Sequence, residues 1–174
     1  RALVSSGFGV DGGPLAETPE TAENLCRMAE ELAIRSSCPT VELRGGHAPA
    51  DWNSWNDSHC GFVSDLADDD EAQLLAVPRK QRAEVRKSLK NDLKVTVGTL
   101  ERDRAAHYSV YAQSVHNLGT PVFPRSLFNA VLCTFGKQAD ILTVWNNNIP
   151  VASVLSLYHQ NTVYPYWGGG TFAA

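Results

Sequence analysis

The sequence lacks the cysteine spacing that marks metal sites and disulfide frameworks. Its four cysteines are scattered and form no C-x-x-C pair, so the sequence predicts neither a bound metal nor a disulfide-stabilised module. Cys26 and Cys133 fall on the apolar faces of predicted helices, which favours thiols buried in a core.

Long apolar runs are missing as well. No stretch of about 18 apolar residues occurs, and no basic segment followed by an apolar run opens the chain. We therefore expect no membrane span and a cytoplasmic location. An excess of positive charge is also absent, because the formal net charge is -4. This balance argues against a chain that coats nucleic acid along its whole surface.

Glycine, by contrast, clusters near both ends of the chain. Gly12-Gly13 and Gly168-Gly169-Gly170 each follow a short strand-like run, and the two clusters lie roughly one domain length apart. The repeat predicts the end of one domain copy followed by the beginning of a second. We place these two parts at residues 1–91 and 92–174.

The first part begins with a strand, a helix and a second strand. Residues 2–10 read as a strand, and Thr18 is a plausible cap for a helix that ends near Ser36. Residues 40–43 then read as a short buried strand, and a further strand is expected at 61–66.

A basic helix is predicted to connect the two parts. The acidic run 68–71 suits the first turn of a helix, and Pro78 is expected to break it. From Arg79 to Lys94 the chain carries seven of its 15 Lys and Arg residues. We expect the boundary just after this segment, near Asn91.

The second part predicts a strand, two helices and three further strands. The strand spans 94–97, one helix spans 103–118, and Pro124 starts the next helix, which Gly136 ends. The inward residues are expected to be Ala105, Tyr108, Tyr111, Val115 and Leu118 in the first helix, and Leu127, Phe128, Val131, Leu132 and Phe135 in the second. Antiparallel strands at 140–145, 151–158 and 162–167 follow, which indicates an α+β fold.

This order of elements resembles the first half of the GNAT acyltransferase fold. Two such copies in tandem resemble the FemAB family of aminoacyltransferases. The amino-acid sequence is similar to that of the FemAB-like proteins associated with exosortase and PEP-CTERM systems. The segments that carry the resemblance span residues 77–82, 85–87, 117–124, 139–144 and 150–157. It covers nearly the whole chain and implies parts of two GNAT-like domains with mixed, mostly antiparallel sheets flanked by helices.

One departure concerns the cofactor. Acetyl-CoA-binding GNAT members carry Gln or Arg, then two residues, and then a Gly-x-Gly or Gly-x-Ala turn, which holds the pyrophosphate. Here Gly168 follows Tyr164-Pro165-Tyr166-Trp167, and Asp11 before Gly12 would repel a phosphate. The resemblance therefore leaves aminoacyl-tRNA and acyl-CoA both open as donors, and neither glycine cluster looks like a good coenzyme A site.

The basic helix is the sharpest polar feature. Arg79, Arg82 and Arg86 recur at spacings of three and four, so they share one helix face. Such a stripe can grip the phosphates of a nucleotide-linked precursor or of tRNA. The alternative interpretation is a solvated face whose charges offset the acidic run before it.

The terminal glycines form the second candidate site. Exposed N–H groups in a turn at Gly168, Gly169 and Gly170 would bind substrate and stabilise an oxyanion. Tyr164 and Tyr166 alternate along the preceding strand, so we expect them on one face as catalytic groups that orient the amine or protonate the leaving group. Aromatic packing in the sheet is the alternative.

A third candidate follows the strand at 40–43. Arg44 stands beside Gly45 and Gly46, where it could line a cleft, and His47 is a candidate base. The tryptophans Trp52 and Trp55 could stack on a sugar or cover the edge of the domain.

These patterns predict an acyl- or aminoacyl-transferase. The resemblance implies an amine acceptor on a cell-envelope or exopolysaccharide precursor that is linked to a nucleotide. The lack of a catalytic triad fits acyl transfer, in which holding donor and amine together supplies much of the rate. An acyl-CoA-dependent GNAT N-acyltransferase and a non-catalytic scaffold for a nucleotide-sugar precursor are the alternatives.

Overall fold

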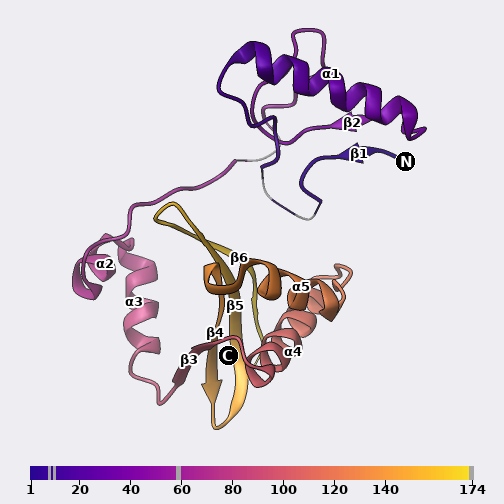
Figure 1. Cartoon of the computed structure of the whole chain (residues 1–174). Helices are drawn as coiled ribbons and strands as arrows, with labels where there is room; N and C mark the ends of the chain where they lie inside the picture. The colour runs from indigo at the N-terminus through magenta and orange to yellow at the C-terminus, as the bar shows by residue number, and fades with distance from the viewer. Residues whose placement is uncertain (8, 10, 58–59, 173–174) are drawn as a thin grey trace. The chain divides into compact units, whose positions relative to one another are not determined.

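The structure, a computed structural model, describes residues 1–7, 9, 11–57 and 60–172. The chain divides into two units, Arg1–Asp65 and Leu66–Ala174, of which the first runs from indigo to magenta in Figure 1. This division reflects how compact each unit is and does not test where one domain copy ends and the next begins. The boundary near Asn91 therefore stays a prediction.

Helix α1 (Pro19–Arg35) in the first unit begins and ends where the sequence predicts. The Thr18 side chain accepts a hydrogen bond from the backbone N–H of Thr21 at 3.2 Å, which satisfies one of the open donors of the first turn. Ala22 and Cys26 are buried on its inner face. The prediction of a core thiol is therefore confirmed for Cys26.

Two short strands flank this helix. β1 (Leu3–Val4) and β2 (Val41–Glu42) pair in parallel, and α1 makes the connection between them. The strand predicted over 2–10 is shorter in the structure, and Phe8 and Val10 lie outside the described residues.

Two other predictions in this part of the chain are wrong, one about burial and one about a strand. The strand expected to be buried at 40–43 is half-buried at Val41 and exposed at Glu42. No strand forms at 61–66, where every residue is exposed and none joins a sheet. An apolar run needs a neighbouring strand to satisfy its backbone groups, and the sequence pattern does not report whether one is there.

The second unit opens with two consecutive helices. α2 (Asp70–Ala76) is capped by Asp69, whose carboxylate accepts the N–H of Ala72 at 2.8 Å. Pro78 separates α2 from α3 (Arg79–Ser88), as predicted. Neither helix fully buries a residue, so both present most of their surface to solvent.

A four-stranded antiparallel sheet forms the centre of the second unit. Its strands are β3 (Lys94–Gly98), β4 (Ala139–Asn146), β5 (Ile149–His159) and β6 (Thr162–Gly170), in that spatial order. Between β3 and β4 come α4 (Glu101–Asn117), α5 (Arg125–Phe135) and the 3-10 turn η1 (Gly136–Gln138). The predicted order of strand, two helices and three strands is confirmed.

The hairpin turns follow from asparagine and glutamine in the left-handed region. Asn147 and Asn148 have φ of 48° and 65°, and Gln160 and Asn161 have φ of 44° and 61°. Two consecutive residues with positive φ make the type of turn whose twist matches paired antiparallel strands. These turns set the registers of β4 on β5 and of β5 on β6.

The predicted glycine turn at 168–170 is wrong, because β6 continues through all three glycines. Gly168, Gly169 and Gly170 lie opposite Val154, Ser153 and Ala152 of β5. A long antiparallel partner supplies hydrogen bonds that override the weak strand propensity of glycine.

Helices α4 and α5 pack on the sheet (Figure 1). The buried cluster consists of Tyr111, Phe128, Leu132, Ala139, Ile141 and Leu155. The apolar face predicted for α5 is confirmed at Phe128 and Leu132, whereas Phe135 at the helix end is 44% exposed. Cys133 is exposed rather than buried.

The buried face of α4 differs from the predicted one. Ala106, His107, Val110 and Tyr111 are buried, whereas Leu118 is 78% exposed. The predicted inward residues did not include His107, so the predicted apolar stripe is rotated around the helix relative to the face that is buried in the structure. Burial of this histidine moves the contact face by part of a turn.

Helix α4 lies close to β6 at Gly169. A Cβ atom there would lie 2.5 Å from the Cβ and 2.6 Å from the Oγ of Ser114. Such distances do not occur between real atoms, so any side chain at this position forces helix and strand apart. Glycine at this position is therefore a packing requirement.

We expect Gly169→Ala to lower the free energy of unfolding by about 2 kcal/mol through this clash. Denaturant unfolding measures the loss, and Gly61→Ala is the matched control, because a Cβ there meets nothing within 4 Å. Ser114→Gly should restore part of the loss in the double variant, beyond its own helix cost of about 1 kcal/mol. Strictly additive effects would contradict the close contact.

Candidate functional site

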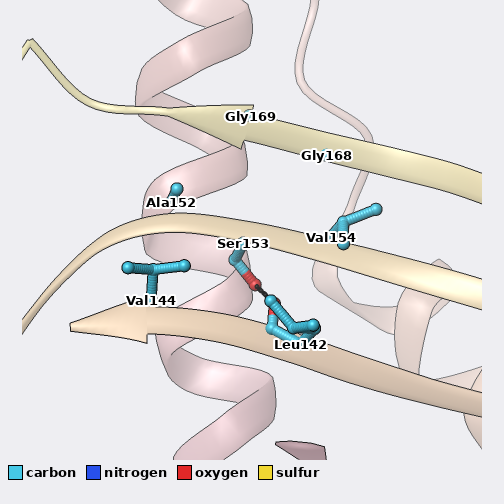
Figure 2. A pocket seen from close by; sticks show the side chains of 7 residues that line it. All are labelled: Leu142, Val144, Ala152, Ser153, Val154, Gly168 and Gly169. Carbon is cyan, nitrogen blue, oxygen red and sulfur yellow. Dashed lines mark hydrogen bonds between the residues drawn. The ribbon is translucent and has the colours of Figure 1, made fainter. Parts of the chain in front are cut away.

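A shallow hollow of about 280 Å³ lies over β4, β5 and β6 (Figure 2). It is lined by Leu142, Val144, Ala152, Ser153, Val154, Gly168 and Gly169. The lining residues Leu142, Val144, Ala152 and Val154 are half-buried, while their strand neighbours are buried. Because successive strand residues point to opposite faces, these side chains lie on the face away from α4, and Figure 2 shows that helix behind the strands.

The glycines lower one wall of this hollow. Gly168 stands opposite Val154 and Gly170 opposite Ala152, so the β6 side has no side chains at these positions. A Cβ at Gly168 would lie 3.2 Å from a methyl group of Val154 and from the carbonyl oxygen of Ser153. A ligand can therefore come close to the β6 backbone here.

The open edge of β6 also offers hydrogen-bond donors. β6 is the last strand in the sheet of the described residues. The N–H of Thr171 donates to the carbonyl of Val151 at 2.8 Å, and backbone groups alternate along an antiparallel strand. Gly169 consequently faces β5, whereas the N–H groups of Gly168 and Gly170 point to the open edge.

A bulge in β6 separates the two tyrosines. Leu155 pairs with Trp167 and Ser156 pairs with Pro165, so Tyr166 is an extra residue between two pairs. Simple alternation no longer holds across it, so the expectation that Tyr164 and Tyr166 share a face stays a prediction. Tyr164 is 44% exposed, and the Tyr166 ring lies 4.6 Å from the Trp167 ring, centroid to centroid.

Sequence reasoning missed a buried polar cluster beneath the hollow. Nδ1 of His107 lies 3.1 Å from Oγ of Ser153, which lies 3.1 Å from Oγ1 of Thr143. Ser153 also donates to the carbonyl of Leu142 at 3.0 Å, the bond drawn in Figure 2. Since the single Ser153 proton is used there, His107 Nδ1 carries a proton and donates it to Ser153.

Burial controls the charge of this histidine. His107 is 1% exposed, and desolvation lowers its pKa to about 4. Nε2 has no hydrogen-bond partner among the described residues, which suits an unprotonated acceptor better than a buried N–H. His107 is thus a neutral structural residue, and the polar periodicity of α4 gave no signal for it.

The third candidate site lies in the first unit. Nε of Arg44 donates to Glu42 at 2.9 Å, and Nε2 of His47 lies 3.2 Å from a carboxylate oxygen of Glu23. Gly13 packs against the backbone of Gly45, which leaves no room for a side chain. The structure thus brings the first glycine pair next to the segment that follows Arg44.

The basic stripe lies on α3. Arg79 and Arg86 are exposed, and within the described residues neither forms an ion pair. Arg82 is half-buried, and its Nε donates to the carbonyl of Val77 at 3.1 Å, so this side chain also holds the start of its own helix. The helix therefore carries all three arginines, as predicted. The side chains of Arg79 and Arg86 are available to a ligand, whereas that of Arg82 is partly engaged.

The predicted site residues occupy three places in the chain. Tyr164, Tyr166 and the three glycines share β6, the arginine stripe is on α3, and Arg44 and His47 belong to the first unit. Throughout the described ranges, no three His, Cys, Asp or Glu side chains gather to hold a metal ion. In the same ranges, every helix is too short or too polar to cross a membrane.

Comparison with known families matches this sheet and its helices. A family model described as an acetyltransferase (GNAT) domain matches residues 79–173. The match covers more than half of the chain, and the chain belongs to this family. Membership and the α+β architecture indicate an acyl-transferase kind of function. A search of curated proteins found no match.

The buried histidine makes stability depend on pH. Unfolded histidine binds a proton below about pH 6.5, whereas His107 binds one only below about 4. Protons therefore favour the unfolded chain between these values, and stability is full above this window and falls as the pH falls through it. We expect a loss of about 3 kcal/mol from this group.

Denaturant unfolding at several pH values tests this expectation. His107→Gln keeps a polar contact for Ser153 but does not titrate, so its stability should fall less steeply over the same window. His116→Gln, an exposed position on the same helix, is the control and should retain the slope of the unmodified chain. Equal slopes for all three proteins would contradict the assignment.

Proposed function

We propose that this chain is part of a FemAB-like transferase that moves an acyl or aminoacyl group onto an amine of a cell-envelope or exopolysaccharide precursor. The observation that carries the proposal is the edge of β6, where N–H groups of Gly168 and Gly170 point outward beside a shallow apolar hollow. Such donors suit the carbonyl oxygen of an activated acyl group.

The proposed reaction forms an amide at this edge. The amine nitrogen attacks the acyl carbon, and the oxygen of the tetrahedral intermediate accepts hydrogen bonds from the β6 backbone. The ester or thioester bond then breaks, the attacking nitrogen gives up one proton, and the leaving oxygen or sulfur takes one up. We assign the leaving-group proton to Tyr166 and the orientation of the amine to Tyr164, because both precede the glycines on the same strand.

The charge on α3 favours a donor or acceptor rich in phosphate. Arg79 and Arg86 are exposed without ion pairs in the described chain, and with Arg82 they suit the phosphates of tRNA or of a nucleotide-linked precursor. No Arg or Gln stands before Gly168 in the pattern that holds the pyrophosphate of coenzyme A. We therefore place aminoacyl-tRNA ahead of acyl-CoA and the reaction in the cytoplasm.

An acyl-CoA-dependent N-acyltransferase is the second candidate, because the matched family model is described as an acetyltransferase domain. A scaffold that binds a nucleotide-sugar precursor without turnover is the third.

We also propose that the first unit is the end of a preceding GNAT-like copy. Its strand, glycine pair, helix and second strand occur in the order of the second half of such a domain, where the fourth strand leads into a glycine-rich turn and a long helix. On this proposal Arg44 and His47 bind substrate at the end of β2.

Binding of the two donors separates these candidates. The chain is titrated with aminoacyl-tRNA and with acetyl-CoA at about 50 and 200 mM salt, where phosphate contacts weaken steeply. We expect tRNA binding whose salt slope falls by about two in the double variant Arg79→Ala, Arg86→Ala. Lys137→Ala, a control on an exposed cation of η1, should leave it unchanged.

The other outcomes are equally decisive. Micromolar binding of acetyl-CoA without tRNA binding would replace the proposal by the acyl-CoA enzyme and make α3 a solvated face. If neither donor binds, the non-catalytic scaffold for a nucleotide-sugar precursor is the candidate that remains.

Tyrosine variants test the chemical roles in a single-turnover transfer assay with the donor that binds. We expect Tyr166→Phe to slow transfer about 100-fold with donor affinity unchanged, and Tyr164→Phe to slow it less. Tyr158→Phe is the control, because its hydroxyl already donates to Asp140 at 3.1 Å. Unchanged rates in both β6 variants would reduce the two tyrosines to packing residues.

A further inference from the structure

A larger groove lies wholly within the first unit. Its volume is about 640 Å³, within the range of small-molecule sites. It is lined by Glu30, Ala33, Ile34, Cys38, Pro39, Thr40, Val41, Asp51, Trp52, Asn53 and Trp55. These residues come from the end of α1, the approach to β2 and the loop after it.

Two tryptophans give the groove an aromatic surface. Trp55 is 78% exposed, which is unusual for so large an apolar ring. Trp52 is half-buried, and its indole N–H donates to a carboxylate oxygen of Glu30 at 2.8 Å. One ring is thus held in place by a hydrogen bond, while the other is open to a ligand.

The charged groups of the lining are all acidic. Among the described lining residues, Glu30 and Asp51 are the ionisable side chains besides the Cys38 thiol. Arg27, which does not line the groove, is bound by Asp51 at 2.6 Å, by Glu23 at 2.8 Å and by Glu30 at 3.1 Å. Three carboxylates share one guanidinium, so the cluster keeps an excess of negative charge.

Arg27 also favours the ionised form of Asp51. Its hydrogen bonds lower the pKa of Asp51 below the ordinary range. Oε1 of Glu30 accepts from both Arg27 and Trp52, whereas the other oxygens of Glu30 and Asp51 each accept one hydrogen bond and retain a further lone pair.

We propose that this groove binds an amino sugar. The protonated amine is attracted by Glu30 and Asp51 and by the faces of the tryptophan rings. The C–H face of the sugar ring lies on Trp55, and the side chains of Thr40 and Asn53 offer partners for hydroxyl groups. The inference rests on the proposed function in one respect, because it names the class of acceptor, but binding itself needs no donor.

Other ligand classes fit less well. A phosphate would be repelled by the acidic lining, and a wholly apolar segment would leave the remaining lone pairs of the two carboxylates without hydrogen-bond donors. An ammonium group on a hydroxylated ring satisfies the aromatic, acidic and polar groups together.

Calorimetric titration of the chain tests this with the disaccharide of glucosamine and its N-acetylated counterpart, which has no charge. At about pH 6.5 the free amine is protonated, since amines of this kind lose their proton at higher pH. We expect the amine form to bind at least about tenfold more tightly than the acetylated form, a difference of about 1.4 kcal/mol. Higher salt should reduce this difference.

Variants locate the binding. Trp55→Ala should weaken binding of the amine form about tenfold. Asp51→Asn keeps the shape of the side chain but removes its charge, so it should reduce the ratio between the affinities for the amine and the acetylated forms. Met28→Ala, an exposed position on α1 outside the lining, is the control. Circular dichroism verifies that each variant is folded.

The result is decisive without any transfer assay. Selective binding that is lost in Trp55→Ala supports the groove, even if neither acyl donor is used. Equal binding of both disaccharides, binding that survives Trp55→Ala, or no binding of either sugar would overturn it. Failure of the donor titrations alone would leave this inference standing.

Discussion

The contact between α4 and β6 at Gly169 is the constraint on which the second unit depends. Because no Cβ fits between this glycine and Ser114, the helix can settle directly on the edge of the sheet. The same row of glycines acts differently on the opposite face, where Gly168 and Gly170 leave the wall of the hollow without side chains. One short sequence thus permits close helix packing on one side and close ligand approach on the other.

The polar cluster between α4 and the sheet adds specificity to this packing. Burying His107 and Ser153 in an apolar core is unfavourable unless they are hydrogen-bonded, and their bonds form only when α4 sits at one position over β5. Ser153 also bridges to the β4 backbone, so the helix position and the strand pairing are coupled. A core made of apolar residues alone would tolerate sliding that this arrangement excludes.

The sequence predicted what depends on local chemistry. The cap at Thr18 and the proline at Pro78 marked helix starts, and the asparagine turn at 147–148 marked a hairpin. Capping, the fixed φ of proline and a positive φ are all properties of a few adjacent residues. It failed where distant partners decide. The glycines at 168–170 read as a turn because their pairing with β5 was invisible, and the bulge at Tyr166 was equally hidden in the sequence. His107 was misplaced because its partner is 46 residues away.

The small net charge of the chain conceals two regions of opposite sign. The exposed arginines of α3 carry positive charge without ion pairs in the described residues, whereas the groove of the first unit is lined by carboxylates that outnumber their single guanidinium. Each region excludes the ligand that the other attracts. The overall charge balance therefore says little about either ligand, because attraction depends on the local group of charges.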